Sequence, residues 1–282
     1  MDAVADDLLV IGGGAMGLFT AYHASAAGKR VTVLERGRIG DPATASYGLT
    51  RSFRADYLDP AYARLADEAR RLWEAFERET GARALVRCGC LNIASAAVTP
   101  DLEETYAELS HATMTELGLA AEALDGGTLR ERYPYLEADL GRLAVEAGVV
   151  DQVAVRGALV AALAERGVAV VENVETTALA RSGDAFRAVT SAGPFQARAL
   201  VIAAGHGTND LLELLDGCSL EVPISRDRPS EAKYLTPSEP ERFTAPAMPV
   251  VAYLDTGIYC HPIVEGLTDA VKIGYYNPPD MP

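Results

Sequence analysis

A glycine cluster followed by a carboxylate is the first group of residues whose types and spacing could do chemistry. Gly12, Gly14 and Gly17 form a Gly-x-Gly-x-x-Gly pattern, and Glu35 ends the next apolar segment. Glycines at this spacing allow a tight turn, close approach of a pyrophosphate and close packing of a helix on a strand. A carboxylate at Glu35 can accept hydrogen bonds from ribose hydroxyls, which favours a free 2′-hydroxyl over a 2′-phosphate. These residues predict a dinucleotide site for either FAD or NAD.

The elements around the glycines are predicted to form one βαβ unit. Residues 8–11 and 30–34 are short apolar runs typical of buried strands, and residues 16–27 have a helical pattern closed by Gly28. Parallel strands joined by a helix predict an α/β layer. The helix N-terminus would face the phosphates with free N–H groups and a favourable dipole.

Further along the chain, a second long helix is predicted over residues 59–80. Asp59 is its expected N-cap, Pro60 its first residue and Gly81 its stop. Apolar residues recur at helical spacing and predict a stripe that faces the core. The stripe consists of Tyr62, Leu65, Ala69, Leu72, Trp73 and Phe76.

The rest of the sequence alternates between helices and strands. We expect helices over residues 101–117 and 155–166, and strands over residues 91–94, 168–171 and 198–205. From residue 223 the chain is punctuated by prolines and contains short alternating segments, which predict further strands.

Composition and charge exclude several classes of function. Of the 282 residues, 49% are hydrophobic and 23% are charged, which is typical of a soluble globular protein. The net charge of −15 would repel nucleic acid and anionic membrane surfaces alike. We therefore expect a small-molecule ligand, with local positive groups to hold any anion.

Cysteine usage and the N-terminal residues favour a cytoplasmic protein. Cys88 and Cys90 have no second pair to complete a zinc site, so no metal is expected and the thiols are expected to be reduced. Three acidic residues precede the first apolar run, unlike a cationic signal peptide, and no apolar stretch is long enough to span a bilayer.

A series of segments in fixed order resembles a known enzyme family. The segments are ASYGLTRSFR, LWEAFERETG, LRERYPYL, LVIAAGHGTNDLL, GIYCHP and VKIGYY. Together they resemble the flavin-dependent amine oxidases of the monomeric sarcosine oxidase group, which includes N-methyltryptophan and pipecolate-type oxidases, within the D-amino-acid oxidase superfamily. The resemblance covers nearly the whole chain and implies FAD rather than NAD.

The resemblance implies an α/β protein of two domains. A Rossmann-like FAD-binding domain would comprise residues 1–84 and 148–218, and a substrate domain with a mixed β-sheet would comprise residues 85–147 and 219–282. Carried over by position, the FAD-binding residues are Gly12, Gly14, Gly17, Glu35, Arg36, Ser46, Thr50, Arg51, Val174 and Gly205.

Three cations, Arg54, Arg51 and Lys272, are the residues to which the chemistry is assigned. Arg54 matches the arginine that pairs with the substrate carboxylate, and a planar guanidinium suits bidentate binding. Arg51, the second candidate catalytic residue beside Lys272, could join Arg54 on one face if the segment is a helical turn. The alternative is that both arginines pair with surface acids.

Lys272 matches the lysine that lies near flavin N5, where reduced flavin meets oxygen. A cation there would stabilise superoxide as its charge develops. Strand alternation places Lys272, Gly274 and Tyr276 on one face, and the glycine would leave a gap into which a flat ring could fit. The alternative is an exposed strand lysine.

The remaining pocket positions depart from the family pattern. Tyr47 and Tyr276 replace histidines, and Cys260 replaces a pocket tyrosine, so sarcosine itself is a doubtful substrate. His206 and His261 could act as general bases, although single histidines at such positions are more often structural.

These observations predict an FAD-dependent oxidase that converts the C–N bond of a secondary or cyclic amine or amino acid to an imine, with O2 as acceptor and H2O2 as product. The chain ends before the family's C-terminal segment, which carries the flavin-linking cysteine in many members, so we expect noncovalent FAD within this chain. The alternatives are a truncated, catalytically silent FAD-binding protein, or one chain of a split oxidase with a partner chain. An NAD-dependent dehydrogenase is disfavoured because no second nucleotide-binding half is evident.

Overall fold

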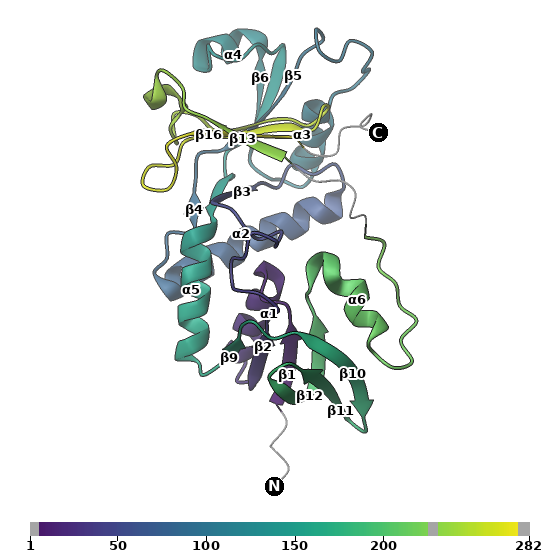
Figure 1. Cartoon of the computed structure of the whole chain (residues 1–282). Coiled ribbons are helices and arrows are strands. Elements are labelled where there is room, and N and C mark those ends of the chain that lie inside the picture. Colours follow the sequence, from purple (N-terminus) through teal and green to yellow (C-terminus); the bar gives the residue numbers. More distant parts are fainter. Residues whose placement is uncertain (1–5, 225–230, 276–282) are drawn as a thin grey trace. The chain divides into compact units, whose positions relative to one another are not determined.

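The computed structural model describes residues 6–224 and 231–275, which divide into two compact units (Figure 1). Unit 1 comprises Met1–Gly48 and Gln152–Asp227, and unit 2 comprises Leu49–Asp151 and Arg228–Pro282. Residues 49–84, which we predict to belong to the FAD-binding domain, group with unit 2. They do so because strand β3 (Thr50–Phe53) pairs with β8 (Gly148–Asp151) and helix α2 (Pro60–Thr80) contacts α3 (Tyr106–Glu116).

Unit 1 contains a six-stranded sheet in the order β10-β11-β12-β1-β2-β9. Its strands are β1 (Asp6–Ile11), β2 (Val31–Leu34), β9 (Ala169–Val171), β10 (Thr176–Ser182), β11 (Ala185–Thr190) and β12 (Gly193–Ile202). The four strands β12, β1, β2 and β9 are parallel, whereas β10 and β11 form an antiparallel extension. The chain leaves β1 for β2 on one side and returns through β12 on the other, which makes the end of β1 a topological switch point.

Two helices of unit 1, α1 and α5, lie side by side (Figure 1). The helical elements are α1 (Ala15–Ala26), α5 (Gln152–Glu165), the 3-10 turn η1 (Gly205–Gly207) and α6 (Thr208–Glu213). The predicted βαβ unit is therefore confirmed. The chain leaves α1 through Gly28, whose φ of 76° is the left-handed conformation that glycine adopts readily.

Unit 2 contains a mixed seven-stranded sheet in the order β13-β16-β15-β14-β5-β7-β6 and a three-stranded sheet in the order β3-β8-β4. The strands not yet given are β4 (Leu85–Val86), β5 (Cys90–Ala94), β6 (Ala121–Asp125), β7 (Leu140–Ala144), β13 (Glu231–Leu235), β14 (Val250–Tyr253), β15 (Ile258–His261) and β16 (Val271–Tyr275). Strands β5 and β14 are parallel, and the other neighbouring strands of the large sheet are antiparallel. The predicted α/β class with a mixed second sheet is confirmed.

The helices of unit 2 begin at side-chain caps. Asp59 accepts a hydrogen bond from the Ala61 N–H at 2.7 Å, as predicted for α2. Helix α3 begins later than predicted because Thr105 and Glu108 form a reciprocal capping box there. The remaining elements are α4 (Gly126–Arg132) and the 3-10 turn η2 (Pro240–Phe243).

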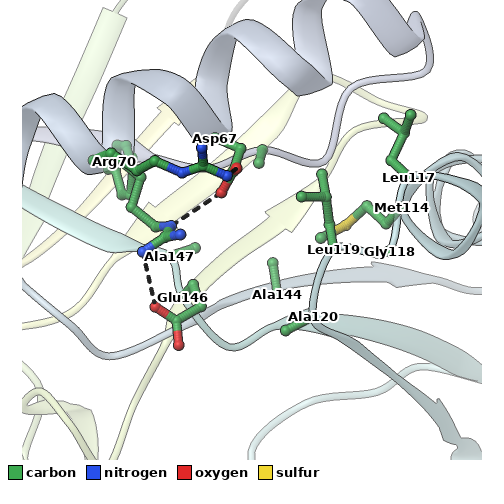
Figure 2. A pocket seen from close by; sticks show the side chains of 13 residues that line it. Asp67, Arg70, Met114, Leu117, Gly118, Leu119, Ala120, Ala144, Glu146 and Ala147 are labelled. Carbon is green, nitrogen blue, oxygen red and sulfur yellow. Dashed lines mark hydrogen bonds and ion pairs between the residues drawn. The ribbon is translucent and has the colours of Figure 1, made fainter.

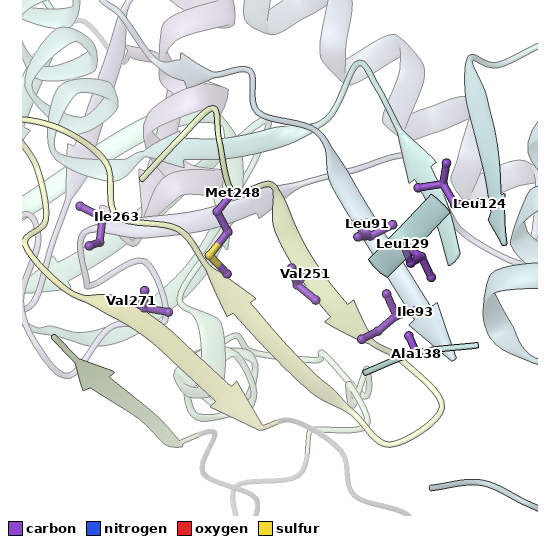
Figure 3. Packing of buried hydrophobic residues seen from close by; sticks show 9 residues of the cluster. All are labelled: Leu91, Ile93, Leu124, Leu129, Ala138, Met248, Val251, Ile263 and Val271. Atoms are coloured by element: carbon purple, nitrogen blue, oxygen red, sulfur yellow. The ribbon is translucent and has the colours of Figure 1, made fainter. Parts of the chain in front are cut away.

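The main core of unit 2 lies on one face of the large sheet (Figure 3). Its buried members are Leu91, Ile93, Leu124, Leu129, Ala138, Met248, Val251, Ile263 and Val271. Cys260 and Ile273, which pair across β15 and β16, pack against this cluster. Because side chains alternate along a strand, the neighbours of these two residues must face the opposite side.

The apolar stripe of α2 is largely exposed, contrary to the prediction that it faces the core. Phe76 is 2% exposed, but Tyr62 and Leu65 are each 61% exposed and Leu72 is 51% exposed. In the described part of the chain, the helix buries Ala63 and Phe76 only. Helical periodicity identified the amphipathic helix but not which of its faces is covered.

Candidate functional site

The glycine loop of unit 1 is packed so tightly that side chains cannot be added. A Cβ at Gly12, where φ is 112°, would lie 2.3 Å from the Ala203 carbonyl oxygen. A Cβ at Gly17 would lie 1.8 Å from the Gly12 carbonyl oxygen. Both contacts are far below van der Waals distance and involve backbone atoms, so the loop requires glycine at both positions. The two strand ends that flank it are joined directly, since the Ala203 N–H donates to the Ile11 carbonyl at 2.7 Å.

The N-terminus of α1 presents hydrogen-bond donors at the end of this loop. Gly14 is the N-cap and supplies no side-chain cap, while Ser46 Oγ accepts from the Ala15 N–H at 2.9 Å. Among residues 6–224 and 231–275, no atom accepts a hydrogen bond from the backbone N–H group of Met16 or Gly17. Two backbone donors and the positive end of the helix dipole therefore suit an anion such as a pyrophosphate. The structure places Ser46 beside this anion site.

Glu35 lies at the end of β2 and is oriented by backbone donors. Its Oε2 accepts from the Gly13 N–H at 2.7 Å and its Oε1 accepts from the Gly37 N–H at 2.8 Å. A carboxylate oxygen has two lone pairs, so each oxygen can accept one further hydrogen bond. The Glu35 carboxylate is thus fixed in position and retains acceptor capacity for the two hydroxyls of a ribose.

Three other predicted cofactor residues of unit 1 occupy different environments. Val174 is buried and its N–H donates to the Glu35 carbonyl at 2.9 Å, so a contact to adenine would use its own carbonyl oxygen. Gly205 follows β12 with a φ of 57° and is exposed. Arg36 is also exposed. Taken together, unit 1 fits the phosphates and the ribose of a dinucleotide, because the loop, the helix end and Glu35 lie at the carboxyl ends of parallel strands.

In unit 2, two cations converge on one carbonyl oxygen of β3. Lys272 Nζ donates to the Thr50 carbonyl at 3.3 Å, and Arg51 Nη1 donates to the same oxygen at 2.8 Å. Lys272 is only 7% exposed, and burial together with the nearby Arg51 lowers its pKa to about 8. A cation held in a largely desolvated site suits stabilisation of a developing negative charge. The alternative of an exposed strand lysine does not hold.

His261 is a buried, neutral member of this cluster. Its Nδ1 lies 2.9 Å from Thr50 Oγ1 and its Nε2 lies 2.8 Å from Ser52 Oγ. Burial, with Lys272 and Arg51 nearby, lowers its pKa to about 3. A histidine with so low a pKa and with both ring nitrogens hydrogen-bonded is a weak base, so the structural role fits it better than general-base catalysis. The other histidine candidate, His206, lies in η1 and is exposed.

The gap that Gly274 leaves beside Lys272 is filled by a ring of the protein itself. A Cβ at Gly274 would lie 2.1 Å from Cζ of Tyr259, which is its cross-strand partner. Lys272 Nζ lies 5.5 Å from the centroid of the same ring, within the range of a cation–π contact. Tyr259 was missed by sequence reasoning. In the sequence, Gly274 indicated that a ring could lie beside Lys272. Only the β15–β16 register shows that this ring belongs to Tyr259.

Arg54 lies just after β3 and is held from two sides. Its Nη1 donates to Asp56 Oδ1 at 2.9 Å, and its guanidinium carbon lies 4.7 Å from the Tyr57 ring centroid. The segment that precedes it is a strand rather than the helical turn that would have placed Arg51 and Arg54 on one face. Arg54 pairs with Asp56, an acid that is fully buried.

The remaining predicted pocket residues do not all join this cluster. Cys260 faces the core with Ile273, on the side opposite Lys272, so the structure does not bring it to the cationic site. Thr50 is 1% exposed and its hydroxyl is bonded to His261. Tyr47 belongs to unit 1 and is 49% exposed. Tyr276 lies outside the described residues.

Three thiols of the chain are poor nucleophiles for attachment to a cofactor. All four cysteines are free. Burial raises the pKa of Cys88 to about 11, and it raises those of Cys90 and Cys260 to about 12. Because the thiolate is the reactive form, these three side chains are unreactive near neutral pH.

A cavity of about 410 Å³ in unit 2 is lined by none of the predicted site residues (Figure 2). Arg70 lies within it and pairs with Asp67 at 3.1 Å and with Glu146 at 3.7 Å. The other lining residues are Phe53, Ala55, Arg71, Met114, Leu117, Gly118, Leu119, Ala120, Ala144 and Ala147. The charges in the lining are paired with one another, and no predicted catalytic or substrate-binding residue is among them.

Comparison with known proteins identifies the family to which this arrangement belongs. Residues 7–280 match the family described as DAO, FAD dependent oxidoreductase. The chain belongs to this family. The prediction of FAD as the cofactor is confirmed, as is the resemblance to the sarcosine oxidase group within it.

The chain matches only part of the length of individual relatives in the DAO family. The chain is 29% identical over 221 residues to peroxisomal sarcosine oxidase from Homo sapiens, which covers 77% of this chain and 54% of that protein. It is 27% identical over 213 residues to N-methyl-L-tryptophan oxidase from Yersinia pestis (strain Pestoides F), covering 74% of this chain and 56% of that protein. The chain thus spans about half the length of the curated relatives it matches.

A solved structure shows the same fold. L-proline dehydrogenase from P. horikoshii superposes with a TM-score of 0.79 at 19% identity, covering 97% of this chain and 70% of that chain. Within residues 6–224 and 231–275, no group of three or more metal-ligating side chains occurs. The same residues include no helix that is both long and apolar enough to cross a membrane.

Proposed function

We propose that this DAO-family chain takes part in oxidation of the C–N bond of an amino acid whose nitrogen is a secondary or cyclic amine. The single observation that supports this most is the pair of cationic sites in unit 2. Lys272 and Arg51 share the Thr50 carbonyl, and Arg54 is oriented by Asp56. The names of the relatives favour the same substrate class, since they include a sarcosine oxidase and an N-methyl-L-tryptophan oxidase.

FAD, when bound, would take a hydride from the carbon next to the amine nitrogen and pass two electrons to O2, which gives an imine and H2O2. In this proposal the protein binds and orients the reactants. Gly12, Gly14, Gly17 and the N-terminus of α1 hold the pyrophosphate, and Glu35 accepts hydrogen bonds from the ribose. We propose that Ser46 assists at the pyrophosphate and that the Val174 carbonyl and Gly205 lie against the cofactor.

The cations of unit 2 have separate roles in the proposal. Arg54 binds the substrate carboxylate through its guanidinium, which directs the α-carbon toward the oxidant. Lys272 carries a positive charge at neutral pH and stabilises the negative charge that develops on oxygen. Arg51 adds a second positive charge beside it, and the Tyr259 ring lies within cation–π range of the lysine ammonium group.

We also propose that FAD is held without a covalent bond in this chain and that the protein functions in the cytoplasm. The high pKa values of the Cys88, Cys90 and Cys260 thiols support the first point. Four free cysteines support a reducing compartment. Acid precipitation tests the first point directly: flavin colour that moves to the supernatant supports noncovalent binding, and colour that stays in the pellet contradicts it.

A panel of amines tests the proposed activity. We expect the FAD-loaded protein to form H2O2 with at least one N-methyl or cyclic amino acid and to do so much more slowly with the corresponding amine that lacks the carboxylate. Bound FAD with no turnover across the panel would favour the alternative of a catalytically silent FAD-binding protein, or of one chain of a split oxidase.

A further inference from the structure

A buried charge cluster surrounds Arg54. Asp56 is 0% exposed, and its two oxygens face different guanidinium groups: Oδ1 accepts from Arg54 Nη1 at 2.9 Å, and Oδ2 pairs with Arg142 Nη2. Arg142 is 1% exposed. Asp56 and Arg142 are 86 residues apart in the sequence and were not identified as site residues from it.

The fold fixes Arg142 from several directions. It lies on β7, where it pairs across the sheet with Asn92 of β5. Its Nε donates to Ser110 Oγ at 3.1 Å and its Nη1 lies 3.7 Å from Met114 Sδ, both on α3. The guanidinium is thus held between the sheet and α3 and cannot reach a ligand.

The charges of this cluster do not balance. Among these three side chains, one carboxylate lies between two guanidinium groups, so that the positive charges outnumber the negative charge by one. A buried ion pair is seldom the most stable way to fill a core, and an excess charge makes the arrangement less favourable still. Of these three side chains, Arg54 is the most exposed to solvent: its side chain is 17% exposed, against 0% for Asp56 and 1% for Arg142.

We propose that Arg142 determines the preference of the site for a carboxylate by sharing the charge of Asp56. Without Arg142, the Asp56 carboxylate would neutralise Arg54, and the pair would attract an anion only weakly. With Arg142 present, Arg54 retains a net positive charge that the carboxylate of an amino acid can neutralise. This inference rests on the proposed role of Arg54 as the carboxylate anchor.

The test is binding of a ligand that cannot be oxidised at an amine. Cyclopentanecarboxylate and its uncharged analogue cyclopentanecarboxamide are titrated by calorimetry into the FAD-loaded protein. In Arg142→Met we expect at least a tenfold loss of affinity for the carboxylate and less than a twofold change for the carboxamide. Arg142→Lys, which keeps the charge, should remain within threefold of the wild type.

A second substitution separates charge from mere structural damage. The double variant Asp56→Asn/Arg142→Met restores one net positive charge and should recover carboxylate affinity to within about threefold of the wild type. An Arg142→Met variant that binds the carboxylate like the wild type contradicts the inference. A double variant that remains tenfold weaker also contradicts it, even where the single variant does not fold.

Arg54→Met distinguishes the inference from the proposed function. If Arg54→Met loses carboxylate binding and Arg142→Met does not, the inference about Arg142 is wrong while the anchor role of Arg54 is supported. If Arg54→Met binds the carboxylate unchanged, the anchor role itself is wrong. FAD content and the thermal unfolding midpoint of each variant serve as folding controls.

Discussion

Replacing Lys272 with methionine should make the protein more stable at neutral pH, because the fold holds this ammonium group where its charge is poorly solvated. The pKa of Lys272 is lowered from 10.5 to about 8, with burial as the main cause and Arg51 as the second. The unfolded chain therefore binds more protons than the native protein between about pH 8 and 10.5. Methionine is of similar length and carries no charge.

The size of the effect follows from the two pKa values. A difference of about 2.5 pKa units corresponds to about 3 kcal/mol of destabilisation, present in full below the native pKa and lost as the pH rises through the unfolded value. We expect Lys272→Met to raise the free energy of unfolding by about 3 kcal/mol at pH 7, by about 2 kcal/mol at pH 9 and by almost nothing at pH 11.

Urea unfolding of the FAD-free protein at these three pH values measures the effect. Lys29→Met is the matched control, because Lys29 is exposed and its replacement should leave the free energy of unfolding nearly unchanged at each pH. A Lys272→Met protein that is no more stable than the wild type at pH 7 would refute the reasoning. A gain in stability that is the same at pH 7 and pH 11 would refute it as well.

Three further substitutions or conditions test other parts of the account. Gly17→Ala should weaken FAD binding at least tenfold, measured by fluorescence titration, because its Cβ would lie 1.8 Å from a backbone oxygen; Gly157→Ala, whose Cβ meets nothing within 4 Å, should bind FAD normally. Gly274→Ala should cost about 1–3 kcal/mol of stability by displacing the Tyr259 ring, and adding Tyr259→Ala should cost less than the two single effects combined. The rate of reaction with O2 should fall by up to about tenfold between pH 7 and 9 as Lys272 loses its proton near pH 8, and Lys272→Met should slow this step far more than flavin reduction. Equal slowing of both steps, or an oxygen rate that rises over this pH range, would contradict the role of Lys272.

The arrangement of the candidate nucleotide site in unit 1 could be predicted because its signal is local. Gly12, Gly14, Gly17 and Glu35 act through one βαβ unit, and a single strand–helix–strand segment fixes their relative positions. The period of a strand likewise placed Lys272 and Gly274 on one face. Such patterns depend on a few neighbouring residues and therefore survive without knowledge of the tertiary structure.

The candidate cationic site in unit 2 depends on pairings between distant segments. Whether residues 50–53 form a strand is decided by β8, about a hundred residues later. The helical turn that would have placed Arg51 and Arg54 on one face is therefore not formed. Tyr259 is identified only by the β15–β16 register, and Asp56 contacts Arg142 although 86 residues separate them in the sequence. The exposed stripe of α2 makes the same point, because periodicity identifies an apolar face but not its partner.

The central claim, that this chain supports oxidation of an amino acid by bound FAD, is tested most directly by following the flavin absorbance of the purified protein during anaerobic mixing with N-methyl and cyclic amino acids. The account predicts that at least one of them bleaches the flavin and that admitting O2 restores the absorbance with formation of one H2O2 per flavin. A protein that binds FAD but is bleached by none of these amino acids, or that is bleached equally by amines without a carboxylate, would contradict it.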